Sequence, residues 1–255
     1  MTDSNRVHFV IAGFPKCGTS ALIRELEKRE FVHLQKTREG YESPLFIQPG
    51  LDISSCCMDD RLNGHKFASY IYSNNALQKI LQHNSKCLFV ICVRDIEHAL
   101  VSWWNMHRQI AVRGSPNSHF VNKSREVRDF YSNCSISEYF VSYAEEKLDY
   151  AVWIRRLLAL SNTLIIVRQS TLKYVLRNVA NHIIQEACSV NDIVNRPTED
   201  LEHETNPARA RKQKAEKLLA EGLTIGSPIR ARIKIFQNAL DELLFELQQE
   251  GIQVL

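Results

Sequence analysis

The most chemically informative stretch of this sequence lies between an apolar run at residues 7–11 and a helical pattern at residues 22–28. Where a strand turns into a helix through glycines, successive backbone N–H groups converge and the helix dipole favours negative charge. We therefore predict a phosphate-binding loop here. After Gly13, its residues are Phe14, Pro15, Lys16, Cys17, Gly18, Thr19 and Ser20.

The place of the lysine separates the kinds of phosphate loop. A Walker loop, which binds a nucleoside triphosphate with Mg²⁺, has its lysine directly after the second glycine. Here Gly13 and Gly18 have Walker spacing, but Thr19 stands in the lysine position and Lys16 lies inside the loop. The pattern therefore fits a metal-assisted triphosphatase poorly. The plainer interpretation is a strand–turn–helix corner with an incidental lysine.

A second candidate anion site follows the apolar run at residues 87–93. Arg94 stands where that expected strand ends, and a helix starting at residue 95 would place Ser102 about two turns later on nearly the same face. A guanidinium and a hydroxyl on one face can hold a second phosphate. The alternative is that Asp95 caps the helix while Arg94 and Ser102 face solvent.

These two patterns resemble the sulfotransferases that use 3′-phosphoadenosine 5′-phosphosulfate (PAPS), best in their carbohydrate or heparan-type branch, as a soluble bacterial-like member. In that family a K-x-G-T-[ST] segment binds the 5′-phosphosulfate, and an arginine at a strand end with a serine eight residues later binds the 3′-phosphate. The resemblance implies that Lys16 stabilises the departing phosphate and that Arg94 and Ser102 bind the 3′-phosphate. It also implies PAPS as co-substrate, without a metal. Gly18, Thr19 and Ser20 would hold the 5′-phosphate.

Three further segments extend the resemblance. The segment 66–70 is similar to a K-x-P-x-Y motif without its proline, so Lys66 would neutralise sulfuryl oxygens or orient the acceptor. The general base of that branch is a glutamate after the second strand, which Glu42 matches better than Glu39. Histidines fill this role in small-molecule sulfotransferases, and the candidates are His65 and His119. Basic residues of the loop that closes over adenine would be Arg209, Arg211 and Lys212, although a solvated helix face explains their charges equally well.

The acceptor is expected to be a small molecule with a hydroxyl or amine, and natural-product tailoring is the suggested setting by analogy. Aromatic residues that could line its pocket are Trp103, Trp104, Tyr41, Tyr70 and Phe120, of which Trp103 fits a core position better.

Two other functions stay open. One is a P-loop kinase of a small molecule, which needs Mg²⁺, and the other is a nucleotide-binding regulatory module without turnover.

Composition limits the class of protein. With 255 residues, 44% hydrophobic content and a net charge of +3, the chain suits one α/β domain over 1–255 and no nucleic-acid partner. Seven irregularly spaced cysteines without a C-x-x-C pair argue against a disulfide framework and against zinc. No signal-peptide or membrane-spanning pattern occurs, so we expect a cytoplasmic protein without a membrane partner. A homodimer is left open.

Alternating strand and helix patterns predict a doubly wound, mainly parallel sheet flanked by helices, of the P-loop-like sulfotransferase type. Such sheets bind ligands at the carboxyl ends of their strands, where four of the segments above fall, at 13–20, 36–42, 66–70 and 94–95. Strands are expected at 7–12, 31–34, 87–93 and 163–167, and the end of another strand at 65–70. Helices are expected at 19–29, after a cap at Asn74 or Asn75, after 95, at 137–160, at 171–188 and from 229, with a long loop or lid at 112–134.

Overall fold

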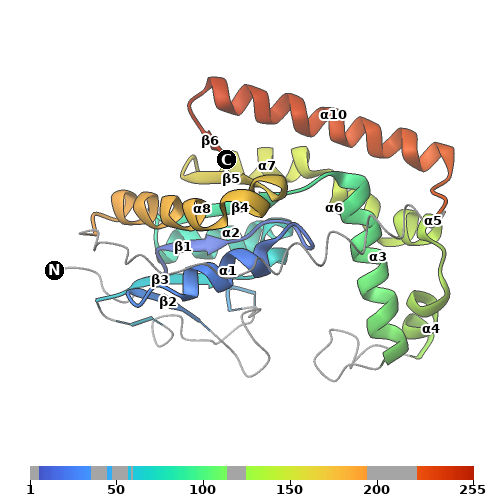
Figure 1. The fold of residues 1–255 in the computed structure, drawn as a ribbon, viewed down its shortest axis with the longest axis horizontal. Coiled ribbons are helices and arrows are strands. Elements are labelled where there is room, and N and C mark those ends of the chain that lie inside the picture. Colours follow the sequence, from blue (N-terminus) through green and yellow to red (C-terminus); the bar gives the residue numbers. More distant parts are fainter. Residues whose placement is uncertain (1–5, 36–44, 48–56, 59, 114–124, 194–222) are drawn as a thin grey trace. The chain divides into compact units, whose positions relative to one another are not determined.

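The computed structural model describes residues 6–35, 45–47, 57, 58, 60–113, 125–193 and 223–255 (Figure 1). The chain divides into two compact units. The first contains the described residues of 1–93, 152–209 and 244–255, and the second those of 94–151 and 210–243. The single domain expected over 1–255 stays a prediction.

The first unit is built on a parallel six-stranded sheet in the order β2-β3-β1-β4-β5-β6. The predicted α/β fold with a parallel sheet is therefore confirmed. Its first strand, β1, lies between β3 and β4, so the phosphate-loop segment follows a central strand. The bounds are β1 Phe9–Ile11, β2 Val32–Leu34, β3 Leu62–Lys66, β4 Leu88–Val93, β5 Leu164–Arg168 and β6 Gln253–Val254.

Helices cover both faces of this sheet, as the apolar strands require. Every residue of β1 and β4 is buried, which is typical of parallel strands covered on both sides. Helices α1 (Thr19–Glu27) and α8 (Gln169–Val190) pack against each other on one face, and α2 (Asn74–His83) lies behind the sheet in Figure 1. Helix α7 (Tyr150–Leu158) begins in the second unit and ends in the first.

The third strand differs from its prediction. The end of a strand was expected at 65–70; β3 (Leu62–Lys66) ends at the start of this range, and residues 68–72 form the 3-10 helix η2 (Ala68–Tyr72). The polar start of β3 concealed it in the sequence. Gly64 is required there because an added Cβ would lie 2.1 Å from Cζ of Phe9, and the buried Asn63 side chain bonds to backbone atoms of Met58.

The N-cap of the helix after η2 lies one or two residues before the predicted cap. Ser73 is the N-cap of α2, and its hydroxyl accepts a hydrogen bond from the backbone N–H of Ala76 at 3.2 Å. Asn74 and Asn75 are already helical. The prediction of an asparagine cap was therefore wrong, and a serine performs the same capping.

The second unit contains one helix that was not predicted, and its predicted long helix is interrupted. Helix α3 (Ile96–Arg113) is followed by α4 (Arg125–Asn133), which occupies part of the predicted loop at 112–134. The helix expected at 137–160 is interrupted by a π-helical turn and by Asp149, whose ψ of 71° is not helical. Its pieces before α7 are α5 (Ile136–Tyr139), η3 (Phe140–Ala144) and α6 (Glu145–Leu148).

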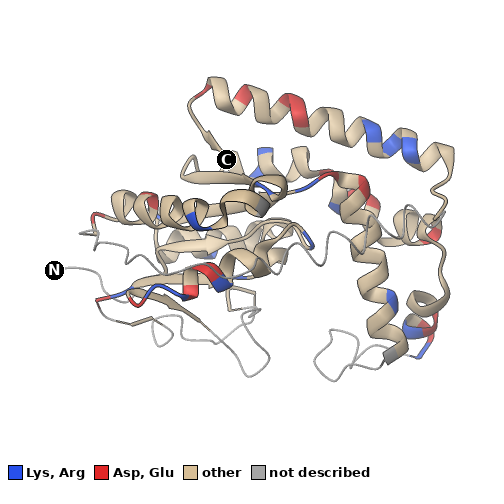
Figure 2. Ribbon diagram, viewed as in Figure 1, with Lys and Arg blue, Asp and Glu red and all other residues tan. Residues whose placement is uncertain are grey.

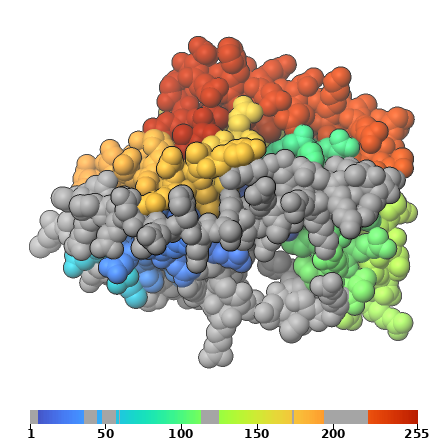
Figure 3. Space-filling view, viewed as in Figure 1, coloured from blue at the N-terminus to red at the C-terminus, as the bar shows by residue number. Residues whose placement is uncertain are grey.

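The last helix, α10 (Ser227–Gln249), runs through residues of both units. Its positively charged residues Arg230, Arg232 and Lys234 appear in blue in Figure 2, and part of α10 is exposed in the space-filling view of Figure 3. Apolar residues recur in α10 at helical spacing and are buried, and they are Ile233, Phe236, Leu240, Leu243, Leu244 and Leu247. The short strand β6 that follows was not predicted.

Candidate anion-binding site

The predicted phosphate loop begins while the chain still lies against β4. Backbone N–H groups of Ala12 and Phe14 donate to the carbonyls of Val90 and Cys92, at 3.2 and 3.4 Å. Between them, an added Cβ on Gly13 would lie only 2.4 Å from the backbone N of Cys92. Glycine is therefore required at position 13 because two backbones approach each other.

The loop then takes a backbone shape suited to anions. Lys16 and Gly18 have positive φ angles of 68° and 95°, and the described residue between them, Cys17, does not. Such alternation turns successive N–H groups toward one side and forms a concave anion-binding site. Gly18 is also the N-cap of α1, and no side chain caps that helix. The amino-terminal N–H groups of α1 therefore have the geometry for an anion.

Lys66 brings a positive charge to this helix end. It is the last residue of β3 and pairs in register with Ile11 of β1. Its Nζ donates to Oγ of Ser20 in the first turn of α1, at 3.4 Å, and the residue is only 3% exposed. A buried ammonium beside the positive end of a helix dipole favours an anionic ligand. The structure thus brings together Lys66 and Ser20, which the sequence only suggested.

The start of α8 closes the other side of the loop. Cδ1 of Leu172 and Cγ of Gln169 would lie 2.9 and 3.3 Å from a Cβ on Gly18. Gln169 is 8% exposed, so its side chain is buried beside the loop. The sequence analysis missed this residue, although its position directly after a buried strand could have indicated it.

The second predicted anion site belongs to the second unit. Arg94 directly follows β4 and is 8% exposed, whereas Ser102 is half-buried in α3. Oδ1 of Asp95 accepts a hydrogen bond from the backbone N–H of His98 at 2.8 Å, so Asp95 caps α3. Burial raises the pKa of the Asp95 carboxyl, but hydrogen bonds from His98 and the nearby Arg94 guanidinium outweigh it and hold that pKa below its usual value. The capping alternative is therefore correct for Asp95, while Arg94 is not a solvent-facing residue.

Most aromatic candidates for an acceptor pocket are core residues. Trp103 and Trp104 are buried in the second unit, where Trp103 contacts the rings of His107 and Tyr143. Tyr70 is fully buried in the first unit. Tyr41 and Phe120 lie outside the described residues.

Of the candidate general bases, one is a core residue and the others lie outside the described residues. His65 is buried, and its Nε2 lies 2.8 Å from the hydroxyl of Tyr70, which is the environment of a core histidine. The other candidates lie outside the described residues, and they are Glu42, Glu39 and His119. The same holds for the predicted adenine-loop residues Arg209, Arg211 and Lys212.

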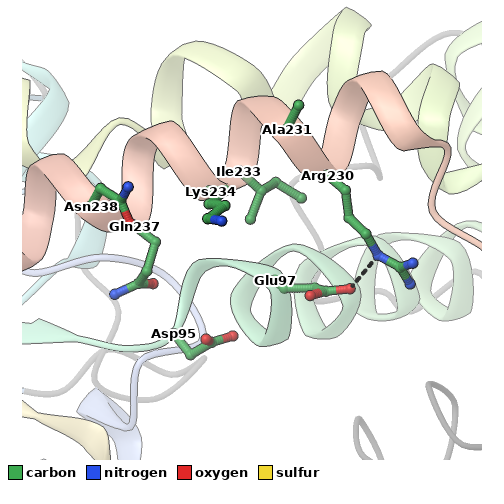
Figure 4. Close-up of a pocket in the computed structure, with 8 residues that line it drawn as sticks. All are labelled: Asp95, Glu97, Arg230, Ala231, Ile233, Lys234, Gln237 and Asn238. Carbon is green, nitrogen blue, oxygen red and sulfur yellow. Dashed lines mark hydrogen bonds and ion pairs between the residues drawn. The ribbon is translucent and has the colours of Figure 1, made fainter.

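The second unit also contains an open pocket of about 390 Å³ between the start of α3 and α10 (Figure 4). Carboxylates of Asp95 and Glu97 line one side, and Arg230 and Lys234 line the other. Nε of Arg230 lies 3.5 Å from Oε1 of Glu97. Because its charges have both signs and none of the predicted site residues lines it, we assign no ligand to this pocket.

The described residues contain neither a candidate metal-binding cluster nor a candidate membrane-spanning helix. No group of three or more His, Cys, Asp or Glu side chains within the described ranges could hold a metal ion. Among the helices that the structure describes, none combines the length and apolar character needed to cross a membrane.

A parallel α/β sheet with a glycine-bounded loop after a central strand defines a phosphate-loop type of protein. Within this class, residues 6–161 match the family described as the sulfotransferase domain, and the chain belongs to that family. No curated protein sequence matches the chain. The carbohydrate or heparan-type branch is not confirmed by these findings.

A solved structure supports this fold. The crystal structure of a sulfotransferase from Alicyclobacillus acidocaldarius is similar over 90% of this chain and 95% of that one, with a TM-score of 0.51 and 17% identity. A sulfotransferase domain from the curacin biosynthetic pathway is similar over 97% and 98% of the two chains, with a TM-score of 0.43 and 10% identity.

Proposed function

We propose that this protein transfers a sulfuryl group from PAPS to a hydroxyl or amine of a small-molecule acceptor. The observation that carries the proposal is the buried ammonium of Lys66 beside Ser20, at the uncapped amino terminus of α1. An anion with several oxygens, such as a phosphosulfate, can contact the N–H groups of the helix end and the lysine ammonium at the same time. Family membership makes sulfuryl transfer the expected chemistry.

The reaction is an in-line displacement at sulfur. The acceptor oxygen or nitrogen forms the new bond to sulfur while the bond from sulfur to the 5′-phosphate oxygen breaks, and the acceptor proton passes to a base. Negative charge spreads over the sulfuryl and leaving oxygens, so positioned cations stabilise the transition state. In this proposal Lys16 stabilises the departing phosphate, Lys66 neutralises sulfuryl oxygens and Glu42 takes the proton.

The remaining contacts to the donor follow the predicted motifs. The backbone of Phe14, Pro15, Cys17 and Gly18 and the hydroxyls of Thr19 and Ser20 hold the 5′-phosphate. Arg94 and Ser102 bind the 3′-phosphate, and this assignment rests on their spacing in the sequence. Arg209, Arg211 and Lys212 are proposed to close over adenine. A carbohydrate-type relationship, natural-product tailoring and a cytoplasmic location belong to the same proposal.

A thermal-shift experiment tests donor binding. Adenosine 3′,5′-bisphosphate at a hundred times its Kd should stabilise the fold by about 2.7 kcal/mol, with or without EDTA. Lys16→Ala should lose most of this stabilisation because it removes a charge from the 5′ site. Arg94→Ala should bind the bisphosphate no better than adenosine 5′-monophosphate. The exposed Arg128 of α4 provides the control, since Arg128→Ala removes the same charge elsewhere.

The outcomes separate the alternative functions. Stronger stabilisation by ATP with Mg²⁺ than by the bisphosphate would support the kinase instead. Transfer is measured with ³⁵S-labelled PAPS and a panel of alcohols, phenols, amines and sugars. Binding of the bisphosphate without transfer to any member of the panel would support a regulatory module.

A further inference from the structure

The helices that follow the two predicted anion sites begin differently. No side chain caps the first turn of α1, whereas side chains accept from two N–H groups in the first turn of α3. One acceptor is the Asp95 carboxylate, which binds the N–H of His98. The other comes from α10, where Oε1 of Gln237 accepts a hydrogen bond from the backbone N–H of Ile96 at 3.1 Å. Figure 4 shows the Gln237 side chain extending from α10 toward the start of α3. An anion at the second predicted site is therefore expected to bind side chains.

The Ile96 N–H depends on this acceptor. Ile96 is completely buried, with 0% of its surface exposed, so water does not reach its backbone. The first N–H groups of a helix have no acceptor within the helix itself. A buried donor that loses its acceptor costs more than the hydrogen bond alone contributes. Gln237 therefore holds the first residue of α3 in place from a neighbouring helix.

A second contact fixes the orientation of the Gln237 amide. Its Nε2 donates to Oδ2 of Asp241, about one turn further along α10, at 3.1 Å. An ionised carboxylate can only accept hydrogen bonds, so the amide nitrogen faces Asp241 and the amide oxygen faces Ile96. A reversed amide would oppose its NH₂ group to the Ile96 N–H and its oxygen to the carboxylate. Asp241 thus keeps the amide oxygen turned toward α3.

The contact between Gln237 and Ile96 adjoins the second predicted anion site. Arg94 is two residues before Ile96, and Ser102 is six residues after it in α3. Arg94 is only 8% exposed, so its side chain is confined by packing and follows any movement of its backbone. A guanidinium binds phosphate through parallel hydrogen bonds that require a definite orientation. A shift of the first turn of α3 would therefore weaken phosphate binding by Arg94.

We propose that Gln237 is a positioning residue for the 3′-phosphate site, because its amide oxygen fixes the backbone at Ile96 and thereby the direction of Arg94. This inference rests on the proposed function, in which Arg94 and Ser102 bind the 3′-phosphate. All of these residues belong to the second unit. A residue of the pocket in Figure 4, to which no ligand is assigned, thus acts on the selectivity for the donor nucleotide.

The test compares Gln237→Met with Gln109→Met. Methionine has nearly the shape of glutamine but lacks the amide oxygen that accepts from Ile96. Gln237 is half-buried and lines an open pocket, so the variant should keep its fold. Gln109 of α3 is also half-buried, and its Nε2 donates to Oδ1 of Asn105 at 3.0 Å. The control therefore removes a glutamine hydrogen bond elsewhere in the second unit.

Hydrogen exchange and nucleotide binding are the two measurements. Exchange of the Ile96 amide should accelerate in Gln237→Met and stay at the wild-type rate in Gln109→Met. The affinity for adenosine 3′,5′-bisphosphate should fall roughly 5- to 10-fold in Gln237→Met only. The affinity for adenosine 5′-monophosphate should stay unchanged, because this nucleotide has no 3′-phosphate. A general loss of structure would weaken the binding of both nucleotides.

Two combined variants show whether the effect passes through Arg94 and through the amide. In an Arg94→Ala background, Gln237→Met should cause no further loss of bisphosphate affinity. Gln237→Glu together with Asp241→Asn exchanges the carboxylate and the amide. This exchange keeps the net charge, an acceptor for Ile96 and a hydrogen bond between positions 237 and 241, so it should retain the preference for the bisphosphate.

The inference is overturned if the Ile96 amide exchanges at the wild-type rate in Gln237→Met, or if the bisphosphate affinity does not fall. It is also overturned if the monophosphate affinity falls as much, or if the loss is equally large without Arg94. A wild-type protein that binds the bisphosphate no better than the monophosphate contradicts the proposed 3′-phosphate site, and this inference with it. A wild type that prefers the bisphosphate, with the same preference in Gln237→Met, contradicts this inference alone.

Discussion

The side chain of Lys16 and its backbone conformation favour different residue types at this position. Its side chain is proposed to face the leaving phosphate, while its backbone has a φ of 68°, in the left-handed region that favours glycine. A lysine there costs roughly 1 kcal/mol relative to glycine. Strain of this kind is common where a loop is shaped for a ligand. The conformation helps to aim the loop's N–H groups, and the side chain adds charge.

Replacing Lys16 by glycine or alanine separates these properties. Both variants lack the ammonium, so both should lose most of the stabilisation by adenosine 3′,5′-bisphosphate. Without ligand, Lys16→Gly should be more stable than Lys16→Ala by about 1 kcal/mol, because only alanine has a Cβ in the left-handed region. Urea denaturation of the two variants measures this difference. A glycine variant less stable than the alanine variant would show that the backbone at this position is not strained.

For single residues, the sequence identified the important charged side chains but not the side chains that they contact. Motif spacing was enough to single out Lys16 and Lys66. It could not show that Lys66 is buried against Ser20, because that contact depends on the register of β3 with β1. It also did not single out Gln169 beside Gly18, since residue type and spacing do not distinguish this glutamine from a surface residue and only its position after a buried strand marks it.

The pairing of β1 with β4 is the element contact on which the loop depends. Gly13 lets the end of β1 run within hydrogen-bonding distance of Cys92, and the chain leaves the sheet only after Phe14. The thiol of Cys92 is fully buried in this pairing, and burial raises its pKa above the usual range for cysteine. This region is thus packed without room for another methyl group.

Gly13→Ala should therefore be destabilising. The added Cβ would lie 2.4 Å from a backbone nitrogen, which cannot move as a flexible side chain can, and overpacking of this kind costs about 1–3 kcal/mol. Gly226→Ala is the matched control, since the nearest atoms to its added Cβ are 3.9 Å away, and its effect should stay within about 0.5 kcal/mol. Thermal unfolding of both variants measures the contrast. Equal stability of the two would contradict the close approach.

Elements with a continuous apolar pattern were predicted well, and those with polar residues were not. The strands at 87–93 and 163–167 correspond to β4 and β5, because buried parallel strands have uninterrupted apolar runs. In contrast, α4 was taken for loop because the stretch 112–134 that contains it is polar, with Gly114, Pro116 and several serines. The two-residue β6 is too short to show any pattern, and it depends on pairing with β5.

At the scale of the whole molecule, a set of polar contacts holds the start of β1, at the opposite end from the loop. The backbone N–H of Val7 donates to Nε2 of His83 at 3.1 Å, and the side chain of Asn84 donates to the Val7 carbonyl at 3.0 Å. Nδ1 of the buried His8 accepts from the backbone N–H of Asn63 at 2.9 Å. Segments from β1, β3 and α2 thus meet at ring nitrogens of His8 and His83 that accept hydrogen bonds, and the His8 nitrogen can accept one only while it is unprotonated.

This arrangement predicts a specific loss of stability in acid. Burial, then the charges of His83 and Arg6, lowers the pKa of His8 from 6.5 to about 4 in the folded protein. Between these two values the unfolded chain binds a proton that the folded protein does not, so stability is complete above pH 6.5 and falls as the pH drops toward 4. The full loss from His8 is about 3 kcal/mol at most.

Denaturation curves of wild type and His8→Asn between pH 4 and 7 provide the measurement. The asparagine oxygen can accept from Asn63 but does not titrate in this window, so the stability of wild type relative to the variant should fall as the pH falls. A constant difference across this range would mean that His8 is not kept neutral by the fold.

The two outermost strands of the described sheet are short, since β2 has three residues and β6 has two. An edge this short offers few unpaired backbone groups for a strand of a neighbouring copy. If this protein forms a homodimer, we expect its subunits to meet through helices, with each sheet remaining separate. Self-association should therefore respond to substitutions on helical surfaces and leave the spectroscopic signature of the sheet unchanged.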